Sequence, residues 1–367
     1  MALSVGIVGL PNVGKSTLFN ALTEKKVEMA NYPFCTIDPS VGVVAVPDSR
    51  LAQLTKFSSS AKSVPTVVEF VDIAGLVSGA SKGEGLGNQF LANIRETDMI
   101  VHMVRIFEDD KIIHANDKIY PLHDLQIINM ELILADLQTL EKRLGNIERD
   151  VKRQIKTAIF EKEVLLKTKN ALEKEQLVSQ IKFEKTEIEI IKALHFLTSK
   201  PMLYVLNKKT GGQNLNEIHD ARFDELMEYL NTNKLKYVIV DASIEQELSF
   251  LEEEEKLIFR RELGADENTN GVVELIQTTY QMLGLITFFT TGQDETRGWT
   301  IKQDSTAPEA GGAIHTDFTD KFIKAEIIFW NDLITVGSYA KAREKGLLRI
   351  EGKEYIVKDG DVIEFKI

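Results

Sequence analysis

An eight-residue stretch near the start of the chain constrains its fold more than any other feature. It fits G-x-x-x-x-G-K-[ST], the pattern of nucleotide-binding P-loops, and it reads Gly9-Leu10-Pro11-Asn12-Val13-Gly14-Lys15-Ser16. Residues 5–8 are apolar and predict a short buried strand, and residues 17–22 predict the start of a helix. A chance match is expected in about one chain in a hundred of this length, and the strand and helix argue further against chance. We therefore predict a phosphate-binding loop.

Each residue type in this loop has a predicted role. Glycines let the backbone turn its N–H groups toward phosphate oxygens, and the following helix adds its positive N-terminal end. Lys15 is expected to reach the β- and γ-phosphates, and the Ser16 hydroxyl is expected to hold Mg²⁺. The residues predicted to bind the nucleotide here are Asn12, Val13, Gly14, Lys15, Ser16 and Thr17.

Two later segments carry groups that such a loop needs. Residues 31–39 contain two prolines and predict a loop, in which Thr36 is the candidate for a mobile threonine that meets Mg²⁺. Residues 66–72 predict a buried strand ending in Asp72, where an acid can complete the Mg²⁺ shell. Gly75 follows, and its backbone N–H can approach the γ-phosphate closely. An ordinary loop threonine and a turn-forming aspartate are the alternatives.

The composition agrees with a globular protein of more than one domain. The chain has 367 residues, 43% of them hydrophobic and 27% charged. Its apolar runs are too short to cross a bilayer, and residues 1–4 lead directly into the first predicted strand, so we predict neither a membrane span nor a signal peptide. The single cysteine, Cys35, suits a reducing cytoplasm. The net charge of −12 argues against a protein that coats nucleic acid.

Three more buried strands are predicted after Asp72, over residues 99–104, 201–207 and 237–241. Polar groups follow the C-terminal end of each strand, which is where ligands bind in open parallel sheets. Residues 78–88 hold four glycines and predict a mobile loop that can become ordered around a γ-phosphate. These features predict an α/β fold.

A helical segment with its own charge interrupts these strands. Residues 146–200 contain neither Gly nor Pro, and a second apolar helical run covers residues 164–197, so an antiparallel helical hairpin is predicted. Residues 142–174 hold ten Lys or Arg against five Asp or Glu, a net charge of +5, whereas residues 215–267 carry −9. A solvated helix face and an arm that contacts RNA phosphates explain this segregation equally well. The predicted apolar seam consists of Met130, Ile133, Leu137, Leu140, Leu144, Ile147 and Val151.

The chain changes character again from about residue 283. Six short strands and an Asp359-Gly360 turn are predicted there. The strands cover residues 287–290, 298–301, 325–328, 347–350, 353–357 and 362–365. This pattern predicts a small separate α+β module, and because it carries no catalytic cluster, a binding role is expected.

Together these motifs resemble the Obg-like ATPase (YchF) family. The resemblance rests on residues 9–17, 31–36, 72–76, 82–88 and 93–97, and its C-terminal part on residues 307–308, 314–318 and 359–362. It spans nearly the whole chain, and the helical segment matches by position more than by residues. It implies a P-loop NTPase sheet of the GTPase type, an inserted α-helical coiled-coil hairpin and a C-terminal β-grasp (TGS) domain. The implied boundaries are 1–126 with 200–282, 127–199, and 283–367.

The resemblance implies a preference for ATP, which the residues can test. A guanine-specific site of this fold reads Asn-Lys-x-Asp, and its acid accepts two N–H groups from guanine. Here the strand ends in Asn207-Lys208-Lys209-Thr210, and Thr210 cannot supply a bidentate acceptor. Each lost buried hydrogen bond costs about 1–3 kcal/mol, so guanine discrimination is expected to fail. The resemblance also implies that the Asn207 side chain and the Lys208 backbone contact adenine.

The resemblance further implies how the attacking water is aligned. Leu76 occupies the place of the usual glutamine and cannot hydrogen-bond water, whereas His114 matches the catalytic histidine of the family. Without the resemblance, a surface-loop histidine would be the simpler interpretation. Asn12 implies activation by K⁺, which would replace the charge of an arginine finger. The predicted catalytic residues are thus His114, Lys15 and Gly75, and the predicted Mg²⁺ ligands are Ser16, Thr36 and Asp72.

The implied function is a cytoplasmic, Mg²⁺-dependent ATPase that acts as a switch and docks on the ribosome. We expect contacts to RNA phosphates through the helical arm and the TGS domain, a monomeric state, and binding to neither DNA nor membranes. A GTPase of ribosome assembly is one alternative, which nucleotide competition separates. A regulatory binding protein whose nucleotide only sets its conformation is another, for which loss of hydrolysis would leave function intact.

Overall fold

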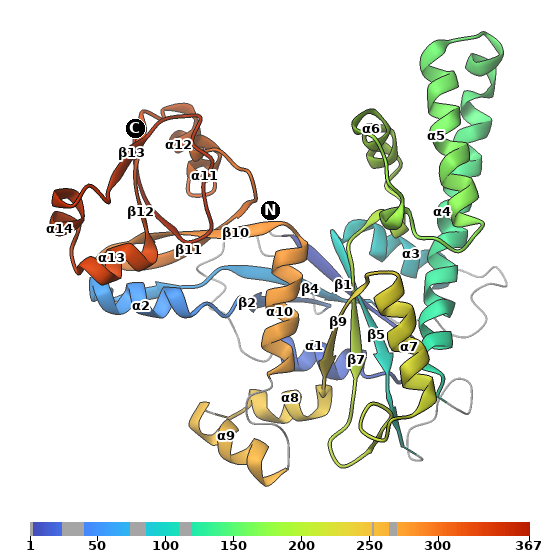
Figure 1. The fold of residues 1–367 in the computed structure, drawn as a ribbon, viewed down its shortest axis with the longest axis horizontal. Coiled ribbons are helices and arrows are strands. Elements are labelled where there is room, and N and C mark those ends of the chain that lie inside the picture. Colours follow the sequence, from blue (N-terminus) through green and yellow to red (C-terminus); the bar gives the residue numbers. More distant parts are fainter. Residues whose placement is uncertain (1–2, 24–39, 74–85, 110–118, 252, 264–269) are drawn as a thin grey trace.

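The computed structural model describes the chain except for residues 1–2, 24–39, 74–85, 110–118, 252 and 264–269. Figure 1 shows a central sheet with helices around it, a helical arm that projects from it, and a second sheet near the C-terminus. None of the helices in the described ranges combines the length and the apolar character needed to cross a membrane.

The central sheet has six strands in the order β2-β4-β1-β5-β7-β9. Neighbouring strands are parallel except at β2, which pairs antiparallel with β4. All residues of β5 and β7 are buried, as expected for the middle strands of a sheet covered on both faces. The strands are β1 (Ser4–Val8), β2 (Val41–Ala45), β4 (Val67–Asp72), β5 (Met99–Arg105), β7 (Met202–Asn207) and β9 (Lys236–Val240).

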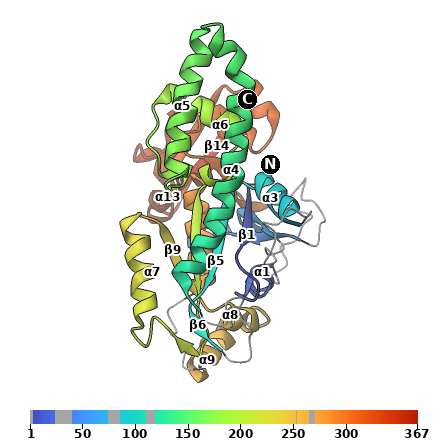
Figure 2. The same ribbon diagram turned by 90° about the vertical axis from the view of Figure 1, so that its right-hand side faces the viewer.

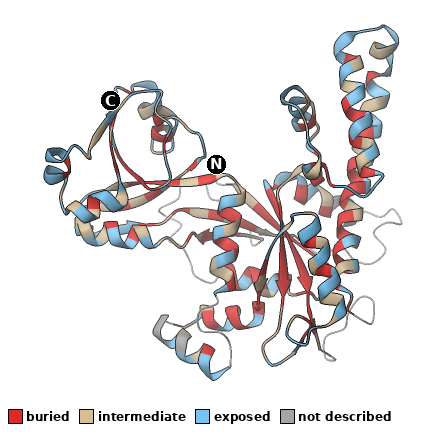
Figure 3. Cartoon of the chain, viewed as in Figure 1, coloured by how far each residue is buried: buried red, intermediate tan, exposed pale blue. Residues whose placement is uncertain are grey.

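Helices cover this sheet and create one continuous apolar core with it. Helix α4 packs on β5 and α7, while α8 packs on α1 and α10 on β9. Figure 3 shows the burial concentrated along the central strands and the helix faces turned toward them. These helices are α1 (Lys15–Thr23), α3 (Leu86–Glu96), α7 (Ala221–Thr232), α8 (Ala242–Ser249) and α10 (Gly271–Met282), whereas α9 (Glu253–Glu262) lies beyond α8, away from the sheet. A two-stranded ribbon, β6 (Phe107–Glu108) with β8 (Gln213–Asn214), lies at the end of the sheet.

The arm consists of α4 (Pro121–Lys152) and α5 (Lys156–Leu172), which run side by side in Figures 1 and 2. With 32 residues, α4 is about 48 Å long. It begins at Pro121, so the expected boundary at residues 126 and 127 falls inside this helix. The predicted seam forms the arm core, except that Met130 lies outside that cluster. An ion pair between Arg143 Nε and Glu161 Oε1, at 2.5 Å, joins the two helices.

The predicted second helical run over residues 164–197 is wrong as a single helix. Helix α5 ends at Leu172, and the chain returns through two short 3₁₀ turns, Val178–Gln180 and Leu197–Ser199, with α6 (Lys185–Leu194) between them. Asp136 of α4 holds the second of these turns in place, because its buried carboxylate accepts hydrogen bonds from the backbone N–H groups of Leu197 and Thr198, both at 2.8 Å.

The second sheet has six strands in the order β13-β12-β14-β10-β11-β3. Five come from the C-terminal part, but β3 (Lys62–Val64) comes from between β2 and β4 of the central sheet and pairs in parallel with β11. The others are β10 (Leu285–Thr291), β11 (Glu295–Lys302), β12 (Lys324–Phe329), β13 (Arg349–Glu351) and β14 (Asp361–Lys366), with α11 (Ala307–Gly312), α12 (Thr316–Asp320), α13 (Trp330–Val336) and α14 (Tyr339–Glu344) around them.

Helix α2 (Ser49–Ser58) belongs to the same insertion between β2 and β4, and it packs on β11 and α13. Leu51 and Leu54 are buried there against residues of the C-terminal part. The sequence predicted a separate C-terminal module. The structure shows instead that an N-terminal segment completes this module.

The strand predicted over residues 353–357 is also wrong. Ile356 forms only an isolated bridge with Thr306. A turn replaces the strand, since Tyr355 N donates to Gly352 O and the Tyr355 hydroxyl donates to Asp361 Oδ2 at 2.8 Å.

Candidate nucleotide site

The P-loop lies between β1 and α1 and is pressed against the end of β5. A Cβ added to Gly9 would come within 2.5 Å of the Met103 carbonyl oxygen, and one added to Gly14 within 2.5 Å of Asn207 Nδ2. Gly14 also has φ of +103°, a conformation that side chains rarely adopt. Asn12 has φ of +61°, which asparagine tolerates better than most residues. Glycine is therefore required where neighbouring strands approach the loop.

Lys15, the first residue of α1, turns its side chain back over the loop. Its ammonium group donates to the Leu10 carbonyl at 2.9 Å, and the residue is 9% exposed. Burial lowers the pKa of Lys15, and the nearby Asp72 carboxylate opposes that shift. A lysine held at the mouth of a glycine loop is well placed to exchange its carbonyl partner for phosphate oxygens.

Ser16 and Asp72 meet at the edge of the loop. The Ser16 hydroxyl donates to Asp72 Oδ2 at 3.2 Å, although 56 residues separate them. One hydroxyl and one carboxylate are a small donor set, but Mg²⁺ in such sites keeps several waters and takes phosphate oxygens as ligands. The described residues contain no group of three His, Cys, Asp or Glu that could form a metal cage. The residues present therefore fit a nucleotide-bound Mg²⁺ better than a metal held by protein alone.

Asn207 joins the P-loop to the opposite side of the site. Its amide nitrogen donates to the Val13 carbonyl at 2.8 Å, and its amide oxygen accepts from Ala242 N at 3.1 Å. The residue is 4% exposed. Both polar atoms of the Asn207 side chain thus have partners inside the protein. The side chain therefore has less hydrogen-bonding capacity left for a base than the resemblance implied.

The next three residues, Lys208, Lys209 and Thr210, form the base-side loop, and each uses its backbone N–H inside the protein. The acceptors are Val240 O for Lys208 at 2.9 Å, Asn214 Oδ1 for Lys209 at 2.8 Å and Asp241 Oδ2 for Thr210 at 2.5 Å. The N–H of Lys208 is therefore not available to a base in this conformation.

Sequence reasoning missed Asp241 and Asn214 as parts of this site. The signal for Asp241 was visible, because it lies between a buried strand and a helix, where aspartate is a preferred N-cap. Asn214 carried no comparable signal, because its two hydrogen bonds to the backbone of Lys209, five positions away, close a loop that no sequence motif marks.

Comparison with known proteins identifies the family. A model described as 50S ribosome-binding GTPase matches residues 4–134, and a YchF-GTPase C-terminal model, described as a protein of unknown function, matches residues 285–367. A Bacillus subtilis protein named Ribosome-binding ATPase YchF is 50% identical over 370 residues, covering 100% of this chain and 99% of its own length. A Haemophilus influenzae protein of the same name is 47% identical, with the same coverage. The chain belongs to the YchF family.

A solved YchF structure has the same architecture. The Schizosaccharomyces pombe YchF GTPase superposes with a TM-score of 0.86 at 35% identity, covering 99% of this chain and 97% of that one. The predicted family and α/β fold class are therefore confirmed.

Three predicted site residues, Thr36, Gly75 and His114, lie outside the described residues, as does Leu76. The structure brings together Asn12, Val13, Gly14, Lys15, Ser16 and Thr17 in the loop and first helical turn, with Asp72 on one side and Asn207 and Lys208 on the other. The roles of all these residues remain predictions.

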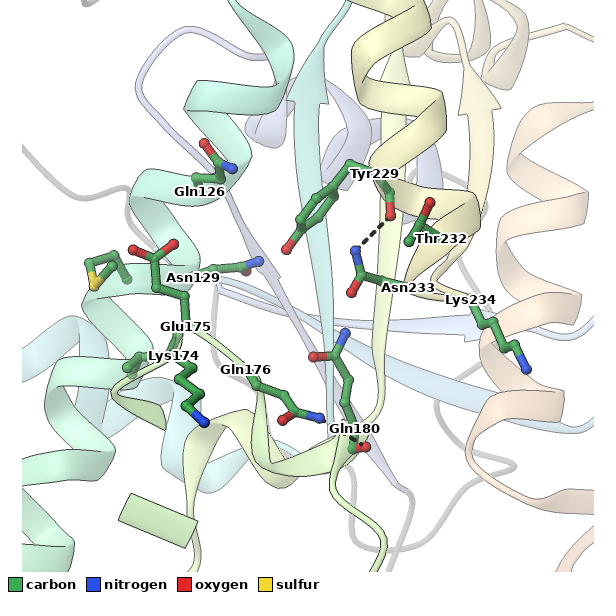
Figure 4. A pocket seen from close by; sticks show the side chains of 12 residues that line it. Gln126, Asn129, Lys174, Glu175, Gln176, Gln180, Tyr229, Thr232, Asn233 and Lys234 are labelled. Carbon is green, nitrogen blue, oxygen red and sulfur yellow. Dashed lines mark hydrogen bonds between the residues drawn. The ribbon is translucent and has the colours of Figure 1, made fainter. Parts of the chain in front are cut away.

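A separate cavity of about 480 Å³ opens at the root of the arm, away from the YchF P-loop. Figure 4 shows side chains from α4, α7 and the turn after α5 around it, with Asn129 and Tyr229 turned toward its centre. None of its lining residues belongs to the P-loop or the base-side loop.

Proposed function

We propose that this chain binds and hydrolyses ATP and acts as a nucleotide-dependent switch on the ribosome. The observation that carries this proposal is the convergence of Lys15, Ser16 and Asp72 at one loop. It is supported by relatives of about half identity over their full length, which are named ribosome-binding ATPases. Hydrolysis is expected to be slow, because no glutamine follows the Asp-x-x-Gly motif.

Each residue of the site has a role in this proposal. Lys15 holds the β- and γ-phosphates, and Ser16, Asp72 and Thr36 hold Mg²⁺, which neutralises phosphate charge when bound. Gly75 donates its N–H to the γ-phosphate, and His114 aligns the attacking water.

The surrounding loop supplies the remaining contacts. Residues 12–17 surround the phosphates, and Asn12 contributes an amide oxygen to a bound K⁺. Asn207 and Lys208 border the base. Because the Asn207 side chain and the Lys208 N–H have protein partners, their contribution is mainly to hold this border in shape.

Ribosome docking is assigned to the arm and the C-terminal module, which we propose is a TGS domain. We propose three domains in a cytoplasmic monomer, over residues 1–126 with 200–282, 127–199 and 283–367, with the insertion of residues 48–64 completing the third. The arm carries a net charge of +5 over residues 142–174, which suits RNA phosphates. We also propose that the chain binds neither DNA nor membranes.

The test measures ribosome co-sedimentation in ATP, in ADP and without nucleotide, together with ATP turnover. Lys15→Ala should reduce turnover at least tenfold and remove the ATP dependence of co-sedimentation. Lys56→Ala, an exposed lysine on α2, serves as the control. Equal co-sedimentation in all three nucleotide states would contradict the switch.

A GTPase is the second candidate, favoured by the Asn207-Lys208 sequence and by the GTPase description of the matched family model. Competition between ATP and GTP for a bound fluorescent nucleotide separates the two. A preference for GTP of tenfold, or about 1.4 kcal/mol, would overturn the ATPase proposal.

A further inference from the structure

Asp241 is a buried acid at the nucleotide site that the proposed mechanism does not use. It directly follows β9 and is 8% exposed. Its Oδ2 accepts from the backbone N–H of Thr210 at 2.5 Å, and its Oδ1 accepts from Ile244 N at 3.1 Å as the N-cap of α8. One carboxylate therefore joins the base-side loop to a helix that packs on α1, the helix that begins at Lys15.

The consequence is a shortage of free backbone N–H donors in the base-side loop. The N–H groups of Lys208, Lys209 and Thr210 all have acceptors inside the protein, and Ala242 N donates to Asn207 Oδ1. Each N–H group is a single donor, so one that is used internally is lost to a ligand. The backbone carbonyl oxygens have two lone pairs each and retain accepting capacity.

This distribution of donors and acceptors matters because adenine and guanine have opposite hydrogen-bonding character at position 6 of the ring. Adenine carries an amino group there, which donates, and guanine carries an oxygen, which accepts. A border rich in acceptors and poor in free donors satisfies the 6-amino group and leaves a 6-oxo group without a partner. Unpaired buried polar groups are the main source of strong discrimination between similar ligands.

We propose that Asp241 is the positioning residue that sets base selectivity, because it withdraws the Thr210 N–H from the site. This inference rests on the proposed nucleotide function and concerns the same site. Selectivity would then depend on a backbone donor and on the acid that holds it, and not only on the Thr210 side chain.

The variant Asp241→Asn tests this assignment. An asparagine at this position can still cap α8, since asparagine is a preferred N-cap. With its oxygen on Ile244 N, its amino group faces the Thr210 N–H, and two donors cannot pair. The asparagine amino group then adds one donor to the base border, and the released Thr210 N–H adds a second. Asp241→Ser keeps a capping oxygen but has no second one, and it also releases Thr210.

Affinities would be measured by competition for ATP, GTP, ITP and inorganic tripolyphosphate, with the melting temperature of each variant. Both variants should move the ATP-to-GTP and ATP-to-ITP affinity ratios toward the 6-oxo bases by about tenfold, with the affinity for tripolyphosphate unchanged. GTP and ITP should shift together, because they share the 6-oxo group. The matched control is Asp220→Asn, the same change at the N-cap of α7, where Asp220 accepts from Arg222 N at 2.9 Å.

Unchanged base ratios in Asp241→Asn at an unchanged melting temperature would overturn the assignment. Parallel weakening of all four ligands, tripolyphosphate included, would overturn it as well, because it would show a general loss of the site. If the parent protein bound neither ATP nor GTP, the proposed function itself would fail. If the parent bound ATP and the variant kept the same ATP-to-GTP affinity ratio, only the role assigned to Asp241 would fail.

Discussion

Arg50 and Asp359 are 309 positions apart in the chain, and 2.5 Å separates Arg50 Nη1 from Asp359 Oδ2. The same guanidinium pairs with Asp48 at 2.7 Å and lies 5.2 Å above the ring of Phe289. Asp359 Oδ1 also accepts from Thr287 N at 2.9 Å. These contacts attach the insertion between β2 and β4 to the C-terminal sheet, and they raise the pKa of Arg50 against the effect of its burial.

Arg50→Ala should lower the free energy of unfolding of the C-terminal module by about 1–2 kcal/mol, because two carboxylates lose a charge-assisted partner while Asp359 stays half exposed. Urea unfolding measures the loss. Hydrogen exchange should locate it in residues 285–367. Lys56→Ala, on the exposed side of the same helix, is the control, and an equal effect of both variants would contradict a specific role for Arg50.

His102 should make folding stability sensitive to acid. It is buried in β5, its Nδ1 has no hydrogen-bond partner among the described residues, and burial lowers its pKa to about 3. The unfolded chain takes up a proton below its ordinary pKa of about 6.5, while the folded chain does not. Stability is therefore complete above about pH 6.5 and falls, by up to about 1.4 kcal/mol per unit, as the pH drops toward 3.

The acid dependence of unfolding in His102→Asn checks this prediction, because the variant has no group to titrate at this position. Its stability should change less between pH 6.5 and 4 than that of the parent. His195→Asn is the control, since His195 is exposed and its left-handed conformation suits asparagine. Identical pH profiles in the parent and His102→Asn would exclude His102 as the source.

Thr210→Asp should shift binding toward guanine by about tenfold relative to adenine, or about 1.4 kcal/mol. The new carboxylate supplies the bidentate acceptor that Thr210 lacks. It also lies next to Asp241, so like-charge repulsion should weaken both nucleotides. Competition with a fluorescent nucleotide measures both ratios, and Thr210→Ala separates the added acid from the lost hydroxyl. A ratio equal to that of Thr210→Ala would refute the prediction.

His114→Ala should lower ATP turnover about tenfold or more with little change in ATP affinity, the pattern of a contact made only in the transition state. Steady-state turnover and nucleotide binding are the two measurements. Turnover should also be higher in K⁺ than in Na⁺ if Asn12 helps to hold a cation. A variant as active as the parent would remove His114 from the mechanism.

The arm should determine ribosome binding through its charge. Lys152 and Arg153 are largely exposed near its tip, and their ion pairs with Glu148 and Asp150 are short-range contacts on the same helix. Twenty helical residues extend about 30 Å, beyond the Debye length of about 8 Å, so positive charge can approach RNA while the acidic body stays away. Replacement of Lys152, Arg153 and Lys156 by Glu should reduce co-sedimentation, and added salt should weaken the parent in the same direction.

Two results accompany this experiment. ATP turnover by the isolated triple variant should stay within about twofold of the parent, because the replaced residues are remote from the P-loop. Binding that survives the triple replacement at moderate salt would exclude the arm as the RNA contact. Five basic residues of the C-terminal module would then be replaced next, namely Lys321, Lys324, Lys341, Arg343 and Lys345.

The sequence by itself determined the features that depend on local pattern. The P-loop, the buried strands of the central sheet and the helical hairpin follow from residue spacing, because glycine turns, apolar runs and three-to-four periodicity act within a few residues. The pairing of Ser16 with Asp72 was predictable too, since the motif and the acid at a strand end are known to share one ion.

Only the tertiary structure decided which segments that are distant in the sequence join the same sheet or hold the same loop. Residues 48–64 join the C-terminal sheet through β3 and Arg50, although they lie between two strands of the central sheet. Asp241 could be recognised from the sequence as an N-cap, but its hydrogen bond to the Thr210 N–H, 31 positions away, could not. Local patterns carry no signal for such contacts, because a side chain's hydrogen-bond partner is set by how the backbone brings remote elements together, and not by its neighbours in sequence.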